Sequence, residues 1–348
     1  MKFMRPYFWI ITVVFALVFA FFFLLCCKKK STKNNISSLE LNQAKKQLNL
    51  QILRYDTDLF SLDLNDLPRE VERLSKLYPP FLIEPDIWND SAQLNGLKAY
   101  LQDTIIIALH LAAEKAIKID HILKDLETAF GYYKVFYPKD PIPTMLTLLP
   151  GLDLTMPSVY LYDHFLCINI DMYLGSDNPY YSAVRLPAYI AERCDPVFLP
   201  VDIFKKAMVF KHWEPTPRTT LIETMINEGK RLFFTEMMFP DLHERYIIGY
   251  SEEKFNWANQ YMGNIWSYLI EKNELFGKGD ALLRLYIEES PFTKQFGSDS
   301  PGRLGIFMGW KLIQSYMKNN PEVTLPDLMQ ESDYQKILNT AKFKPQPK

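Results

Sequence analysis

Apolar residues recur along the chain at two spacings, and these spacings predict the order of its helices and strands. Between residues 119 and 133 the apolar residues follow the i, i+3, i+4, i+7 pattern of an amphipathic helix. Before them, Asn65-Asp66-Leu67-Pro68 has the form of a cap and a first-turn proline, and Pro79 limits the helix that it opens.

Three short apolar or alternating segments then predict a small sheet. They cover residues 145–149, 159–162 and 166–172, and Asp163-His164 marks a hairpin turn between the last two. Beyond Pro187 the pattern is helical almost to the end, with helices expected at 201–210, 219–238, 252–273, 279–288 and 303–319. The fold class is therefore α+β and predominantly α-helical, with a small β-sheet around residues 144–172 followed by a helical half.

An uncharged apolar run extends from Tyr7 to Cys27 and indicates a targeting segment. Its end, Leu24-Leu25-Cys26-Cys27, resembles a bacterial lipobox, and Cys27 fits best as the acylated residue. Cys26 is the alternative. The run is also long enough to span a bilayer as an uncleaved signal anchor. However, four lysines follow the run and two cations precede it, so the positive-inside rule would place the body of an anchored protein on the cytoplasmic side. Residues 1–27 are therefore interpreted as a lipoprotein signal peptide, with the anchor as the alternative.

Composition changes sharply after this segment. Residues 28–48 are rich in Lys, Ser, Asn and Gln and predict a flexible tether, while residues 49–345 are expected to form a single globular domain. Six of the 39 Lys and Arg lie in the first 33 residues, which hold no acid, so the rest carries 33 basic against 41 acidic side chains, a formal charge of −8. This charge argues against binding to nucleic acid or anionic lipid, so attachment to the membrane should depend on the N-terminal lipid.

The polar residues offer little recognisable chemistry. Three His and acid pairs are closely spaced: His110 with Glu114, His212 with Glu214, and His243 with Glu244. None has a second His at metal-binding spacing, because position 247 is Ile where a zinc signature needs His. Nucleotide-binding and Ser or Cys nucleophile motifs are absent from the sequence. We therefore expect no metal, no cofactor and no catalytic residue, and two separately buried thiols at Cys167 and Cys194.

The helix expected at 219–238 places Glu228 at the edge of its apolar side and Gly229 near the centre. A glycine inside a helix costs about 1 kcal/mol against alanine, so Gly229 predicts the close approach of another element. Arg303 opens the last long helix, where a cation opposes the helix dipole and needs an anion nearby. Glu228 and Asp299 are the candidates, and we expect Glu228 and Arg303 to meet.

Several segments together resemble the GldB gliding-motility lipoprotein family of Bacteroidetes. The resemblance rests on ILRYDTDLF (52–60), YLGSDNPYY (173–181), LPAYIAERCDP (186–196), TLIETMINEGKRLFF (220–234), SPFTKQFGSDSPGRLGIFMGWKLIQSYM (290–317) and the closing KFKP. It implies a membrane lipoprotein on the periplasmic side that acts with the gliding machinery and the type IX secretion apparatus. Membership alone implies no molecular activity.

The helical half is also distantly similar to zincin-like peptidases, in which a helix bearing two His precedes a helix with a Glu ligand followed by Gly. Glu228-Gly229 would match the second helix, but the preceding segment 201–210 has Asp202, Lys205 and Lys206 and no His. The similarity therefore implies a peptidase scaffold without the metal pair.

Two functions remain open at this point. The first is a non-catalytic envelope lipoprotein that supports gliding or secretion machinery through contacts with other envelope proteins. The alternative is an envelope hydrolase with a carboxylate site formed by Glu223, Glu228 and Asp299.

Overall fold

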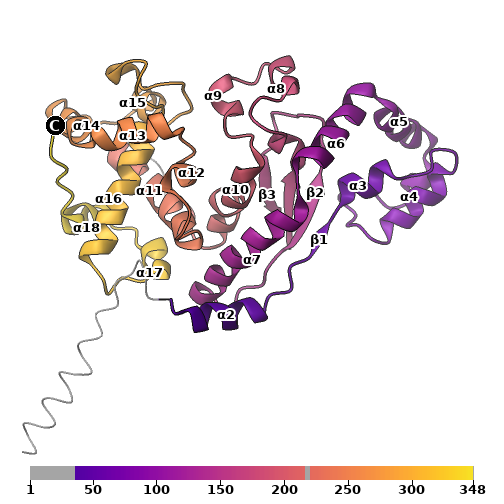
Figure 1. The fold of residues 1–348 in the computed structure, drawn as a ribbon, viewed down its shortest axis with the longest axis horizontal. Coiled ribbons are helices and arrows are strands. Elements are labelled where there is room, and N and C mark those ends of the chain that lie inside the picture. Colours follow the sequence, from indigo (N-terminus) through magenta and orange to yellow (C-terminus); the bar gives the residue numbers. More distant parts are fainter. Residues whose placement is uncertain (1–35, 216–219, 348) are drawn as a thin grey trace, which may run out of the picture.

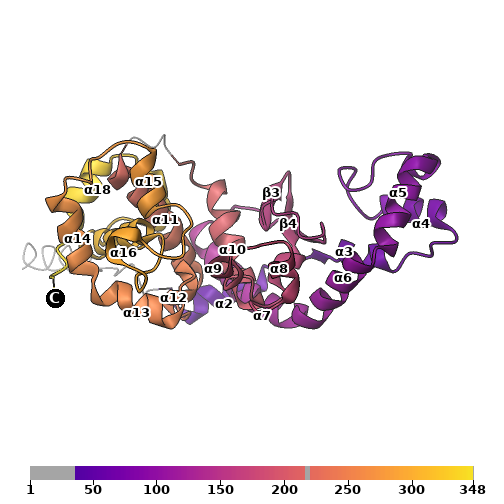
Figure 2. The same ribbon diagram turned by 90° about the horizontal axis from the view of Figure 1, so that it is seen from above.

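The computed structural model describes residues 36–215 and 220–347 (Figure 1). The elements follow one another along an elongated molecule, with α3 to α5 at one end, the sheet in the middle and α11 to α18 at the other end (Figure 2). The predicted lipobox with Cys26 and Cys27 lies outside the described residues.

A four-stranded sheet forms the middle, in the order β1-β2-β4-β3. Its strands are β1 (Ile52–Leu53), β2 (Thr144–Leu148), β3 (Val159–Tyr162) and β4 (Phe165–Asn169). β3 and β4 form the expected antiparallel hairpin, which turns at Asp163 with φ of 54°. β2 runs parallel to both of its neighbours. The last predicted strand is shorter than expected, because Ile170–Tyr173 turn into a 3-10 helix and Met172 therefore lies outside the strand.

Alternation along the strands divides the core between the two faces of the sheet. Leu166 and Ile168 of β4 pack into the main core, while Cys167 between them packs with Leu146 of β2 into a second, smaller core. Helices cover both faces, which is the usual arrangement for parallel strands. The smaller core is closed by α3 (Tyr55–Phe60), α4 (Leu67–Ser75) and α5 (Ser91–Gln102). The main core is closed by α6 (Thr104–Ala116), α7 (Ile119–Phe136) and the helical half.

The helical half is built around the paired helices α11 (Leu221–Met238) and α16 (Leu304–Asn319). The remaining helices are α8 (Pro179–Ala183), α9 (Ala188–Ala191), α10 (Leu199–Lys206), α12 (Glu244–Ile248), α13 (Glu252–Gln260), α14 (Met262–Glu271), α15 (Asp280–Tyr286), α17 (Leu325–Gln330) and α18 (Tyr334–Ala341). The helix predicted at 252–273 is in fact two, α13 and α14, which are separated at Tyr261. The predicted class, α+β and predominantly helical, is confirmed.

The segment predicted as a tether is ordered in its second part. Ser38–Lys46 form helix α2, which begins at a capping box between Ser37 and Glu40 and lies along α7. Lys45 Nζ donates to Thr128 Oγ1 of α7 at 3.1 Å. α2 buries none of its residues, so its polar sequence carries no amphipathic signal strong enough to predict it.

Candidate functional site

Gly229 is placed where the sequence predicts a close contact. A Cβ built on Gly229 would overlap the Gly309 carbonyl and lie 2.9 Å from Trp310 N, and a Cβ on Gly309 would lie 2.9 Å from Met225 Cα. α11 and α16 therefore touch backbone to backbone, and the close approach expected at Gly229 is confirmed.

Arg303 is buried at the start of α16, but its carboxylate is Glu289 rather than Glu228. Arg303 Nε lies 3.4 Å from Glu289 Oε2, and its Nη2 donates to the Ile248 carbonyl at 3.1 Å. Glu228 forms its ion pair with Arg231 one turn along α11. The predicted Glu228–Arg303 pair is thus wrong, because the anion comes from the loop after α15.

The other carboxylates of the predicted hydrolytic site lie apart. Glu223 closes the capping box of α11, where its carboxylate accepts from Thr220 N at 3.0 Å. Asp299 is exposed in the loop before α16 and accepts from the Ser298 hydroxyl. Within residues 36–215 and 220–347, no group of three His, Cys, Asp or Glu side chains is arranged to hold a metal ion.

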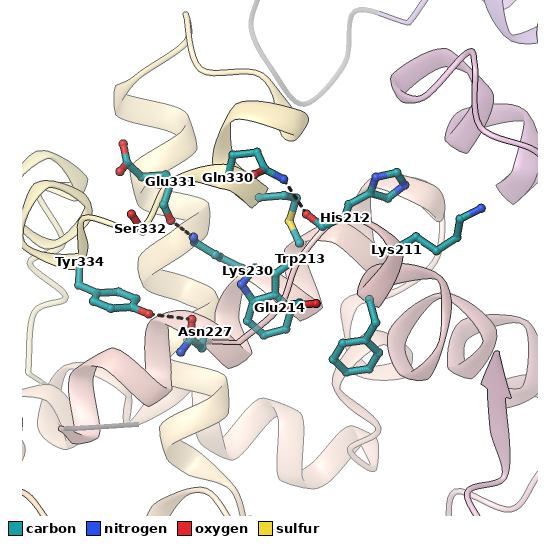
Figure 3. Close-up of a pocket in the computed structure, with 12 residues that line it drawn as sticks. Lys211, His212, Trp213, Glu214, Asn227, Lys230, Gln330, Glu331, Ser332 and Tyr334 are labelled. Carbon is teal, nitrogen blue, oxygen red and sulfur yellow. Dashed lines mark hydrogen bonds between the residues drawn. The ribbon is translucent and has the colours of Figure 1, made fainter. Parts of the chain in front are cut away.

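A pocket of about 450 Å³ opens beside α11, between the segment after α10 and the segment after α17 (Figure 3). It is lined by Phe210, Lys211, His212, Trp213, Glu214, Asn227, Lys230, Met329, Gln330, Glu331, Ser332 and Tyr334. We call it the Lys230 pocket. Its residues come from three separate stretches of the chain, so only the folded protein assembles it.

Lys230 is the unusual residue of this pocket, because it is 2% exposed and forms no ion pair with any described carboxylate. Its Nζ donates to the main-chain carbonyl of Glu331, whose own carboxylate pairs with Lys336. Burial lowers the pKa of Lys230 to about 8, and the charge of Glu331 opposes this shift. An ammonium group has three N–H donors, so two remain for a ligand.

Aromatic and amide groups line the same pocket as this ammonium. Trp213 is 7% exposed and stacks with Phe210 at a centroid distance of 6.1 Å. Tyr334 Oη donates to Asn227 Oδ1 at 3.3 Å (Figure 3). One buried cation beside flat apolar rings and amides is the arrangement that binds a carboxylate carried on an apolar or peptide framework.

His212 contributes its main chain to the wall, where its carbonyl accepts from Gln330 Nε2 at 2.9 Å. Its ring stacks on Tyr137 at a centroid distance of 3.6 Å, and its Nε2 lies 3.2 Å from Asp140 Oδ2. Burial lowers the pKa of His212, so the neutral imidazole is favoured. His212 and Glu214 both contribute to the wall of the pocket.

The position of Lys230 along its helix is a signal for this site, but the residue type alone does not reveal it. Lys230 stands four residues after Ile226 and three before Phe233, so it lies on the same helical face as two buried apolar residues. A lysine in an amphipathic helix is usually assigned to the solvent side. Its partners on the α17 side come from about 100 residues further along the chain, which periodicity cannot reveal.

Within the described part of the chain, no helix combines the length and the apolar character needed to cross a bilayer. No curated protein and no solved structure matches the chain, so the zincin likeness stays a prediction. The family model described as "Gliding motility protein GldB" matches residues 36–345, which is most of the sequence. The chain therefore belongs to the GldB family of gliding-motility lipoproteins.

Proposed function

We propose that this protein is anchored by an N-terminal lipid, faces the periplasm, and supports gliding-motility or type IX secretion machinery by binding other envelope proteins without catalysing a reaction. Family membership supports the link to gliding and to lipid attachment. The Lys230 pocket supports the binding function, and the buried ammonium that lines it without a carboxylate partner among the described residues is the observation that carries the proposal.

Holding Lys230 where it lies is unfavourable for the folded chain. The effective penalty for burying one ion is several kcal/mol, and a carboxylate partner normally offsets part of it. Lys230 has a carbonyl instead. A Met side chain of similar length would fill the same space without this ionic penalty, at the cost of the hydrogen bond to the Glu331 carbonyl. A side chain that destabilises the fold in this way is typical of a site kept for binding.

The chemistry of the pocket points to an acidic partner. A Glu or Asp side chain could accept the two remaining N–H donors of Lys230 and rest its carbons on Trp213. The body carries a formal charge of −8, so long-range attraction would not bring an acidic protein to it. Recognition would therefore depend on contacts inside the pocket, and it should be only weakly sensitive to salt.

The hydrolase alternative has less support. It would need Glu223, Glu228 and Asp299 to act at one point, whereas the first caps α11, the second pairs with Arg231 and the third lies exposed in a loop. A general acid and base must both reach the same substrate bond. The geometry therefore favours binding over catalysis by these residues.

The test replaces Lys230→Met in the full-length protein in its native host. Crosslinked partners are recovered from membranes, and gliding and secretion are scored on the same cells. Lys124→Met is the matched control, because Lys124 is an exposed lysine on α7 and loses the same charge. We expect Lys230→Met to lose a specific partner while Lys124→Met retains it. Identical partner profiles and normal gliding in both variants would contradict the proposal.

A further inference from the structure

A second buried polar site lies beside α10, the helix between the sheet and α11 (Figure 1). Asp202, Lys205 and Lys206 stand at i, i+3 and i+4 on this helix, so their side chains share one face. Arg193 after α9 and Glu289 after α15 meet them across a cavity of about 240 Å³.

The cations of this site outnumber its anions. Lys205 and Lys206 share Asp202, with Nζ to carboxylate oxygen distances of 3.1 and 2.7 Å. Arg193 and Arg303 share Glu289, at 2.8 and 3.4 Å. We call these six side chains the charge cluster; five of them line the cavity, and Arg303 contacts Glu289 from outside the lining. Four cations against two carboxylates leave an excess of two positive charges.

Part of this excess is held out of water, while the Lys206 side chain remains 40% exposed. Lys205 is 6% exposed and Arg303 is 9% exposed. Burial lowers the pKa of Lys205 to about 8; Asp202 opposes this shift, while repulsion from Lys206, Arg193 and Arg303 adds to it. Despite burial, the two lysines hold the pKa of Asp202 well below its usual range, so the carboxylate stays ionised. Lys205 is therefore a buried ammonium that shares its carboxylate, Asp202, with Lys206.

Hydrogen-bond donors are also left over. Lys205 Nζ lies 3.1 Å from Asp202 Oδ1 and 3.2 Å from the Ile247 carbonyl oxygen. These two acceptors account for two of its three N–H groups. The two terminal nitrogens of Arg193 donate hydrogen bonds to the Glu289 carboxylate. The buried Nε of Arg193 has no hydrogen-bond partner among the described residues. Buried donors normally have an acceptor, so these groups indicate room for one more anionic acceptor.

We infer that the cavity at the charge cluster binds a phosphate-type oxyanion, which supplies the two missing negative charges and accepts from Lys205. A volume of about 240 Å³ accommodates one such group with water and lies below the range of about 300 to 1,000 Å³ that larger ligands occupy. The inference is independent of the proposed protein contact, because the Lys230 pocket and this cavity share no lining residue.

Titration calorimetry on the full-length protein in detergent tests this inference. Inorganic phosphate is added at constant ionic strength against chloride, and a saturable heat with one site per chain is expected. A parallel titration with methyl phosphate distinguishes the source. Binding of both means that the site accepts a phosphate group on a larger molecule, and binding of inorganic phosphate alone means a site for the free ion. No saturable heat with either probe would overturn the inference.

Two variants probe the cluster in opposite directions. Lys205→Met removes a charged donor and should weaken phosphate binding about tenfold or more. Glu289→Gln keeps an acceptor for the arginines but removes a negative charge, so it should tighten binding. Lys311→Met is the control, because Lys311 is also largely buried and pairs with one carboxylate, Glu244, outside the cluster. Unchanged affinity in both cluster variants would overturn the inference, and Glu289→Gln keeps the test decisive if Lys205→Met fails to fold.

Discussion

Substitution of Gly309 by alanine tests whether α11 and α16 hold the helical half together by direct backbone contact. The added Cβ would overlap the Met225 carbonyl, which belongs to a helix backbone and cannot rotate away like a side chain. Overpacking of this kind costs about 1 to 3 kcal/mol. Because the Cβ meets backbone atoms of Met225, we expect the cost of Gly309→Ala near the upper end of this range. Alanine recovers about 1 kcal/mol through its better helix propensity. We expect a net loss of about 2 kcal/mol, a large share of a typical stability of about 5 to 15 kcal/mol.

The matched control is Gly96 in the interior of α5. A Cβ on Gly96 would meet nothing within 4 Å, so Gly96→Ala changes only the backbone term. It should raise stability by about 0.5 to 1 kcal/mol. Urea unfolding of the protein measures both effects as shifts of the midpoint at constant slope. A Gly309→Ala variant at least as stable as the parent would refute the backbone contact. The double variant with Gly229→Ala should lose less than the sum of the single losses, because both act on one helix pair.

Other predictions follow from the ends of the chain and from buried titratable groups. Cys27→Ala should release the body from the membrane fraction, and mass spectrometry of the wild type should find a lipidated Cys27 at the mature N-terminus; an intact Met1 would contradict this. Cys167 and Cys194 are free and buried, and burial raises the pKa of each to about 11, so iodoacetamide should modify them slowly at pH 8 until the protein is unfolded in urea. Rapid modification of the folded protein would show that they are accessible. Burial raises the pKa of Asp171 to about 6 from 3.8, so the folded state holds a proton that the unfolded state has lost, and stability should fall as pH rises from about 4 through 6. Asp171→Asn should remove this fall, and an unchanged pH profile would show that Asp171 is not its source.

Periodic apolar patterns predicted the parts of the fold that bury a continuous face. α7, α11, α16 and the hairpin of β3 and β4 each present such a face, and each lies close to its predicted range. β1 is only two residues long and depends on β2 for its pairing, so no pattern of its own marks it.

The sites were predicted less completely than the fold. The close contact at Gly229 could be predicted because a glycine inside a helix is unfavourable by itself. This signal does not depend on knowing which helix makes the contact. The anion of Arg303 could not be assigned, because Glu289 reaches it only through the packing of the loop after α15 against α16. The sequence places Lys230 on an apolar face of α11. Its burial was not predicted, because a lysine is normally expected at the surface.

Our central proposal is that the buried Lys230 serves to bind a partner protein and does not stabilise the fold. The most direct measurement is the free energy of unfolding of the Lys230→Met protein against that of the parent at pH 7. Replacing a buried ion pair by apolar side chains of similar volume is often neutral or stabilising by about 1 to 4 kcal/mol, and Lys230 has no described carboxylate that its removal would leave unpaired. We therefore predict a variant at least as stable as the parent. A loss of about 3 to 5 kcal/mol, the size expected when a buried charge loses its partner, would show that Lys230 is part of a structural pair and would contradict the account.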